Sequence, residues 1–272
     1  MRPFGLALSG GGASGLGHIP VIDELDRAGA RPEAIAGTSI GALIGACMAG
    51  GMTAGRIETH VTGLTSDFAG MGRRLLRMAA WSELGLGLFL DPERIVRIAL
   101  PEGLPDRIED MPIPLTVIAT DFYRQREVRF TKGPLAPALA ASIAIPGLFS
   151  PVVVAGRVYV DGGVSNNLPI EALPEGLPVI AVDAVTKPPD ETATEVPGPL
   201  MASLGAMRIL MRALLERQLR DRAPFALLRP ASCRFGPLDF LRTDEILKAA
   251  EPVREETRQA LRRLAELEPT AG

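Results

Sequence analysis

Short apolar runs alternate along the chain with longer segments whose apolar residues recur at helical spacing. Strand-like composition marks residues 5–8, 34–36, 115–120, 127–131 and 178–185, and residues 152–154 and 157–160 form a predicted hairpin around Ala155-Gly156. Helices are predicted over residues 16–28, 40–48, 53–90, 134–143, 200–222 and 244–267, with a further helix start at Asp91-Pro92. This alternation predicts an α/β fold, a three-layer sandwich with a mostly parallel central sheet between helices.

Composition narrows the class of protein. The 272 residues are 47% hydrophobic and 22% charged, which excludes wholesale disorder, and a net charge of −3 without a basic block argues against nucleic acid. No apolar run approaches the roughly 20 residues of a membrane span. Cys47 and Cys233 match no metal spacing and suit a reducing compartment, so a cytoplasmic location is expected.

The length fits one large α/β domain, or one domain with an appendage. Residues 4–186 are assigned to a catalytic domain and residues 200–272 to a helical C-terminal part packed on the core. Residues 187–199, rich in proline and acidic residues, are interpreted as a loop or linker.

The stretch "ALSGGGASGLG" at residues 7–17 leads from the first strand towards a helix. Gly10, Gly12 and Gly15 have the spacing of a dinucleotide-binding turn, yet the same exposed amides could hold the oxyanion of an acyl transfer. Pro20 is awkward inside a helix, so the regular helix is expected to begin at His18 or Ile19. Residues 10–17 would then be an irregular loop with free amides.

The pentapeptide "GTSIG", Gly37 to Gly41, has the G-x-S-x-G pattern of a nucleophile elbow between a strand and a helix. In such a turn Ser39 would stand at a helix N-terminus, where the helix dipole favours developing negative charge. Glycine and serine also cap ordinary helices, and for the bare pentapeptide the two interpretations are about equally good.

A serine nucleophile needs a base, and histidine is scarce in this chain. His18 and His60 both precede the position that an α/β-hydrolase triad requires, so that arrangement is excluded. We expect His18 to serve packing or the helix start and His60 to lie at the surface. Asp161 follows an apolar strand and precedes two glycines, although Asp121 and Asp183 also lie near strand ends and, from the residues alone, are equally plausible bases.

Taken together, the segments resemble the patatin-like phospholipases, lipid acyl hydrolases with a Ser-Asp dyad. The resemblance spans residues 4–173. It rests on the glycine loop, on G-x-S-x-G, on "ASIAIPGLFSPV" at residues 141–152, and on Asp161-Gly162-Gly163 followed by "NNLP" at residues 166–169. Ser14 stands where the family usually carries Arg or Lys, which puts affinity for anionic lipids in doubt.

The resemblance implies a role for each segment. Ser39 would be the nucleophile and Asp161 its general base, with Gly162 and Gly163 forming the base turn and with Thr38 and Ile40 flanking the serine. Amides of Gly11, Gly12 and Ala13 would form the oxyanion hole. The implied activity is hydrolysis of phospholipid, lysophospholipid or simpler esters without metal or organic cofactor. An acyltransferase with the same dyad and a non-catalytic lipid-binding module are the alternatives.

Two further segments have apolar stripes. Residues 70–90 fit an acyl channel or a lid, but core packing is preferred. The helix from residue 200 combines Met and Leu with several arginines and is compatible with peripheral membrane contact; packing on the sheet predicts the same stripe and is preferred.

Overall fold

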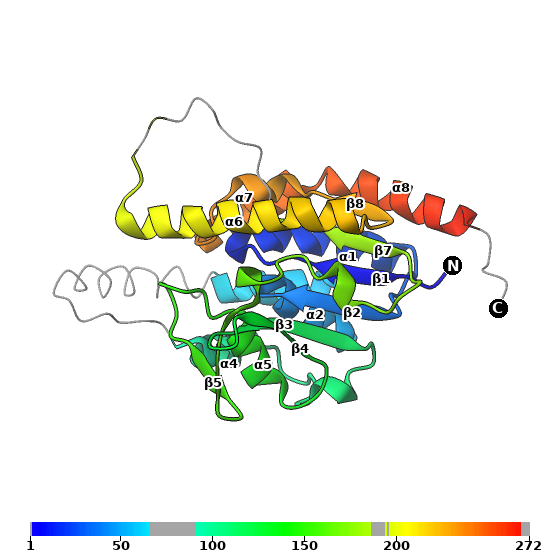
Figure 1. The fold of residues 1–272 in the computed structure, drawn as a ribbon. Helices are drawn as coiled ribbons and strands as arrows, with labels where there is room; N and C mark the ends of the chain where they lie inside the picture. Colours follow the sequence, from blue (N-terminus) through cyan, green and yellow to red (C-terminus); the bar gives the residue numbers. More distant parts are fainter. Residues whose placement is uncertain (1, 66–90, 186–193, 195, 268–272) are drawn as a thin grey trace.

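The computed structural model describes residues 2–65, 91–185, 194 and 196–267, and Figure 1 shows its fold. An eight-stranded sheet forms the middle layer, with strand order β5-β6-β3-β2-β1-β7-β8 and with β4 also paired to β3. The parallel part comprises β1 (Gly5–Leu8), β2 (Ala34–Thr38), β3 (Leu115–Asp121), β7 (Val179–Val182) and β8 (Ala226–Leu228). The antiparallel part comprises β4 (Arg126–Phe130), β5 (Val152–Val154) and β6 (Arg157–Asp161).

Side chains alternate across the sheet and build a core on each face. Leu6 and Leu8 of β1 belong to the larger core, which also contains apolar residues of α1 (His18–Arg27), α2 (Ile40–Ala49), α4 (Pro92–Ala99), α5 (Leu135–Ser142), α7 (Thr243–Ala250) and α8 (Val253–Glu266). Ala7 points to the opposite face, where Leu215 of α6 (Pro199–Asp221) covers small strand residues. The result is the expected three-layer α/β sandwich.

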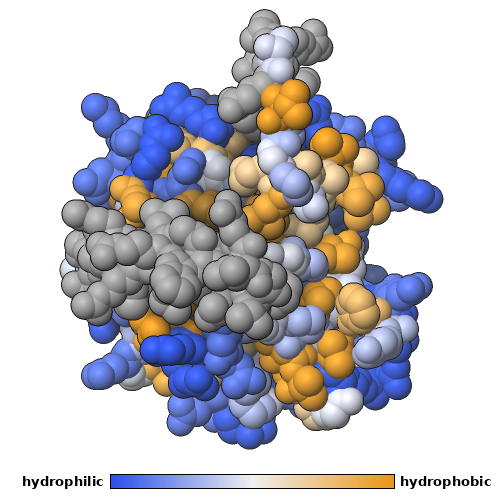
Figure 2. Space-filling model, turned by 90° about the vertical axis from the view of Figure 1, so that its left-hand side faces the viewer, coloured by the Kyte–Doolittle hydropathy of each residue, from blue (hydrophilic) through white to orange (hydrophobic). Residues whose placement is uncertain are grey.

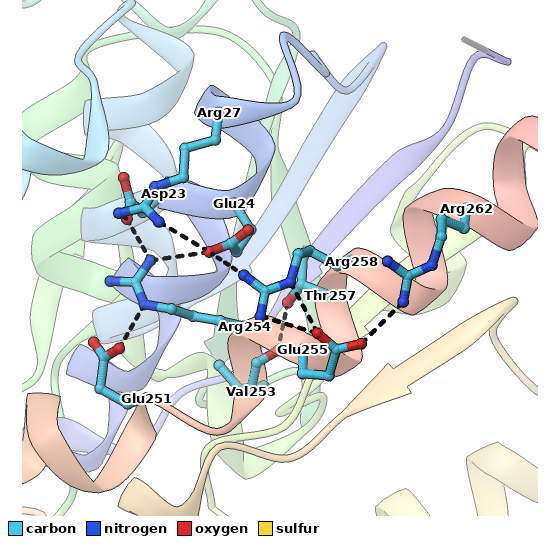
Figure 3. Close-up of polar contacts among 10 residues, drawn as sticks. All are labelled: Asp23, Glu24, Arg27, Glu251, Val253, Arg254, Glu255, Thr257, Arg258 and Arg262. Carbon is cyan, nitrogen blue, oxygen red and sulfur yellow. Dashed lines mark hydrogen bonds and ion pairs between the residues drawn. The ribbon is translucent and has the colours of Figure 1, made fainter.

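An ion-pair network joins α8 to α1 (Figure 3). Arg254 contacts Asp23, Glu24 at 3.4 Å and Glu251 at 2.8 Å, and Arg258 reaches Glu24 at 3.3 Å. The Glu24 side chain is only 4% exposed, so its charge is kept in the protein interior by these guanidinium groups. The C-terminal helix is therefore fixed to the first helix by charge as well as by apolar packing.

Several predicted elements are confirmed. The hairpin of β5 and β6 forms, with positive φ at Ala155 and Gly156, and Asp91 caps α4 by accepting a hydrogen bond from the Glu93 amide at 2.9 Å. The regular part of α1 begins at His18. Residues 54–65 are helical, whereas residues 66–90 lie outside the described residues, together with the proposed acyl channel or lid and most of the loop at 187–199.

Two expectations are wrong, and one strand was not anticipated. Residues Gly12–Gly17 form a 3₁₀ helix (η1) rather than an irregular loop, because the glycines allow a tight turn that leads directly into α1. The segment 244–267 is two helices, because Pro252 cannot continue α7 and instead caps α8. Strand β8 was missed because it is only three residues long, too short for a recognisable pattern. It joins the C-terminal segment to the sheet beside β7.

Candidate active site

Ser39 stands in a strained turn between β2 and α2. Its backbone has φ 54° and ψ −125°, a conformation that non-glycine residues rarely adopt. The turn is tight, since a Cβ added to Gly41 would lie 2.4 Å from the Ser9 carbonyl oxygen, and one added to Gly37 would lie 2.6 Å from the Gly41 carbonyl oxygen. Thr38 ends β2 and Ile40 begins α2, so the pentapeptide has the geometry of a nucleophile elbow.

A second serine holds the elbow in place. The Ser39 amide donates to the Ser142 hydroxyl at 2.8 Å, and that hydroxyl donates to the Ile118 carbonyl at 2.5 Å. Thr38 donates through its hydroxyl to the Asn166 carbonyl at 2.9 Å, which links the elbow to the turn after Asp161. Ser142 was assigned no role from the sequence, although it lies in the segment at residues 141–152 that resembles the family. A polar residue in an otherwise apolar helix was the signal that could have identified it.

Asp161 ends β6 at the same edge of the sheet and faces Ser39. It is 1% exposed, and its Oδ1 accepts a hydrogen bond from the Gly163 amide at 2.7 Å. Burial raises the pKa of Asp161 to about 6, while the Gly163 amide and the Ser39 hydroxyl act in the opposite direction. A carboxylate with this pKa is a better proton acceptor than an ordinary aspartate and is still mostly ionised at neutral pH.

The position of Asp161 depends on a close approach to β3. A Cβ added to Gly162 would lie 2.3 Å from the Ile118 carbonyl oxygen. Thr120 donates to the Asp161 carbonyl at 2.9 Å. Asp161 Oδ2 is buried and makes no hydrogen bond of acceptable geometry with the described residues, so this oxygen remains available for a proton.

The two other candidate carboxylates have different partners. Asp121 Oδ1 accepts from the Arg124 amide at 2.9 Å in the turn after β3. Asp183 is fully buried, pairs with Arg229 at 3.3 Å and accepts from the Val185 amide at 3.1 Å. Among the three, the Ser39 hydroxyl acts on the pKa of Asp161, which distinguishes this carboxylate in a way that the sequence did not.

Neither histidine contacts the dyad. His18 is fully buried, its Nε2 lies 2.9 Å from the Ser9 carbonyl, and burial lowers its pKa to about 4. It is therefore neutral and packs beneath the glycine loop. His60 is half-buried rather than fully exposed, with Nε2 2.9 Å from the Ala99 carbonyl.

Gly11 and Gly12 of the glycine loop line the same cavity as Ser39. Gly11 and Gly12 have φ of 149° and 59°, and their amides make no hydrogen bond with the described residues. The Gly10 amide donates to the Asn167 carbonyl at 3.2 Å, and the Ala13 amide donates to the Pro237 carbonyl at 2.9 Å. The expected contribution of Ala13 to an oxyanion hole is thus contradicted, because its only backbone donor is already used.

A narrow cavity of about 40 Å³ lies over the dyad, enough for about three water molecules. Its walls include Gly11, Gly12, Ser39, Asp161 and Asn167 on the sheet side. Residues of α6 close it from above, and the lining there is mostly apolar: Leu204, Met207, Arg208 and Met211. Further apolar walls come from Ile145, Val185 and Pro237.

Ser14 and Gly15 have structural roles in the glycine loop. Ser14, at the position of the family's usual cation, donates to the Gly11 carbonyl at 2.9 Å, and Gly15 packs against Ile40. Within residues 2–65, 91–185 and 196–267, no group of His, Cys, Asp and Glu side chains could hold a metal ion. No helix in the same part of the chain has the length and apolarity needed to cross a bilayer.

A family profile described as Patatin-like phospholipase matches residues 6–174, which include the glycine loop, the elbow and the base turn. The chain belongs to the patatin-like phospholipase family. This patatin-like chain is 38% identical over 170 residues to an uncharacterised NTE family protein of Mycobacterium tuberculosis, covering 61% of this chain and 44% of the relative. It is 32% identical over 171 residues to the lysophospholipase NTE1 of Mycosarcoma maydis, covering 62% of this chain and 9% of that protein.

Solved structures share the patatin-like fold. VipD from Legionella pneumophila superposes with a TM-score of 0.52 at 17% identity, covering 97% of this chain and 67% of VipD. ExoU, in its complex with SpcU from Pseudomonas aeruginosa, superposes with a TM-score of 0.50 at 15% identity, covering 98% of this chain and 53% of ExoU. The chain spans less than half the length of the curated relatives described above.

Proposed function

We propose that this protein is a serine hydrolase of lipid carboxylic esters, with Ser39 as nucleophile and Asp161 as general base. The observation that carries the proposal is the buried Asp161 carboxylate beside Ser39, in a cavity that Gly11 and Gly12 also line. The printed name of the fungal relative, a lysophospholipase, supports lysophospholipids as candidate substrates.

Acylation begins when Ser39 Oγ attacks the ester carbonyl carbon and its proton passes to Asp161. The Gly11 and Gly12 amides hold the resulting oxyanion, and each well-placed donor of this kind contributes about 3 to 4 kcal/mol in comparable sites. The intermediate collapses when the bond to the alkoxy oxygen breaks, and Asp161 gives that oxygen the proton. Water then gives a proton to Asp161 and attacks the acyl carbonyl carbon. When the bond to Ser39 Oγ breaks, Asp161 returns that proton to Ser39 Oγ and the fatty acid is released.

The face around the active site suits contact with a lipid surface. Figure 2 looks at the side where the parallel strands end, and hydrophobic patches lie there among polar ones. Leu200 and Met201 at the start of α6 are about half exposed and lie one turn from the cavity residue Leu204, and Leu238 is next to Pro237. We expect Leu200, Met201 and Leu238 to rest on a membrane surface peripherally.

Cys47 and Cys233, both free and buried, support a cytoplasmic location.

The test is the release of carboxylic acid from a short-chain ester and from a lysophospholipid. The short-chain ester is included because the cavity over the dyad is narrow. Wild-type protein is expected to hydrolyse at least the short ester. Ser39→Ala and Asp161→Asn should lose nearly all turnover, whereas Ser203→Ala, an exposed serine of α6, serves as the matched control and should keep it. Turnover that survives in folded Ser39→Ala would contradict the proposed mechanism.

A further inference from the structure

A second cavity opens beside the dyad, and it differs in chemistry from the first. It has a volume of about 360 Å³ and lies between the base turn, β4 and the second half of α6. Its polar walls include Glu127, Ser165, Asn166, Asn167, Glu171 and Gln218. We refer to this cavity, defined by these six residues, as the polar pocket.

The polar pocket adjoins Asp161 directly. Asn167 and Met211 line both this pocket and the cavity over Ser39. A Cβ added to Gly163 would lie 2.2 Å from Met211 Cε, 2.9 Å from Asp161 Oδ1 and 3.0 Å from Asn167 Oδ1. The methionine methyl group, the base and the asparagine oxygen therefore meet around Gly163, and Met211 is a flexible side chain at the boundary between the two cavities.

Two residues that line the polar pocket each carry a buried acceptor without a partner. Asn166 Oδ1 and Asn167 Oδ1 are buried and accept no hydrogen bond from the described residues, and the two side chains are 8% and 6% exposed. Leaving such an atom unsatisfied costs about 1 to 3 kcal/mol. A ligand that brings a hydroxyl group would satisfy these oxygens.

The charges of the polar pocket favour an uncharged ligand over an anion. Its walls carry three carboxylates, on Glu127, Glu171 and Asp221, against the guanidinium groups of Arg129 and Arg217. Arg129 is engaged with Glu127, and it also donates to the Glu171 carbonyl at 2.9 Å. This arrangement does not cradle a phosphate, which requires converging cationic donors.

We propose that the polar pocket binds the hydroxyl-bearing alcohol portion of a glycerol ester, with Asn167 as the specificity-determining residue at its entrance. The inference rests on the proposed function, because the proposed hydrolysis mechanism determines on which side of Ser39 the leaving alcohol lies. Asp161 returns the Ser39 proton to the leaving alkoxy oxygen, so the alcohol must lie on the Asp161 side, away from the glycine-loop amides. The polar pocket opens on that side, and the apolar walls of the dyad cavity face the acyl group.

The experiment compares two soluble short-chain substrates with the same acyl group, 1-monobutanoylglycerol and methyl butanoate, each below its aggregation concentration. The quantity measured is the ratio of their kcat/KM values. Two variants change the polar pocket. Asn167→Leu removes the buried acceptor at similar volume, and Leu214→Trp narrows the pocket from an exposed position on α6. Leu210→Trp is the matched control, since Leu210 is 65% exposed on the same helix and does not line the pocket.

The ratio is expected to favour the glycerol ester in wild-type protein and to fall at least about fivefold in Asn167→Leu and in Leu214→Trp, equivalent to about 1 kcal/mol. It should stay unchanged in Leu210→Trp. An unchanged ratio in folded Asn167→Leu and Leu214→Trp would overturn the inference, and if Asn167→Leu does not fold, Leu214→Trp alone decides. If wild-type protein hydrolyses neither ester, the hydrolase itself is contradicted; if it hydrolyses both without preference, only the role of the polar pocket is lost.

Discussion

Replacing Asp161 by asparagine should abolish turnover and at the same time stabilise the fold at neutral pH. The carboxyl group has a pKa of about 6 in the folded protein against 3.8 for an ordinary aspartate, because burial disfavours its charged form. Folding therefore favours the protonated group. The stability that this protonation supports is complete below about pH 3.8 and is lost as the pH rises through 6.

The magnitude follows from the size of the pKa shift. A pKa shift from 3.8 to about 6 lowers the unfolding free energy by about 3 kcal/mol once Asp161 is ionised in both the folded and the unfolded protein, at 1.36 kcal/mol per pKa unit. About 2 kcal/mol of this falls between about pH 4.5 and about pH 7.5. Asparagine carries no charge at any pH, and its oxygen can still accept the hydrogen bond from the Gly163 amide. The variant should thus gain stability over wild-type protein as the pH rises.

The assay is urea unfolding followed by circular dichroism, with wild-type and Asp161→Asn protein compared at several pH values. The difference in unfolding free energy should grow by about 2 kcal/mol in favour of the variant across that pH range. Asp106→Asn, at an exposed position, makes the same chemical change on the surface and isolates the effect of burial. A difference for Asp161→Asn that does not change with pH, or that turns against the variant at high pH, would refute the reasoning.

Three further predictions address the base, the glycine loop and the C-terminal helix. Because Asp161 must be ionised to accept the Ser39 proton, kcat/KM for a neutral ester should fall about tenfold from pH 7 to pH 5, and a profile flat to pH 5 would contradict the assigned pKa. Gly12→Ala should lower kcat by at least about 100-fold, because the added Cβ would lie 2.2 Å from the Pro237 carbonyl oxygen and displace the proposed oxyanion donor. The control is Gly29→Ala, which should keep kcat, because Gly29 has nearly the same φ of 61° and open space around it. Arg254→Met should destabilise the fold by about 1 to 3 kcal/mol in thermal or urea unfolding, because it removes one of the cations around the buried Glu24. A loss of stability no larger than that caused by replacing a surface arginine would contradict the role of the network in Figure 3.

The sequence predicted well those features that a local pattern encodes. The strands β1, β2 and β7 are continuous apolar runs, and the elbow at Ser39 lies between a strand and a helix as its glycines indicated. The start of α1 followed from Pro20, which only the first turn of a helix tolerates.

Features that depend on contacts between distant segments were out of reach. The Ala13 amide is used by Pro237, more than 200 positions away along the chain, and nothing near Ala13 indicates this. The residues alone left three aspartates as possible bases, because all of them lie near strand ends, and only the family resemblance singled out Asp161. The unpartnered oxygens of Asn166 and Asn167 are a property of packing, which no spacing reveals.

The central claim, a serine made nucleophilic by a buried aspartate, is tested most directly by a fluorophosphonate that labels only activated serines. Intact-mass and peptide mass spectrometry should show one adduct per chain, located on Ser39, with the labelling rate strongly reduced in Asp161→Asn. Folded wild-type protein that takes up no adduct, or an adduct on another serine, would contradict the account.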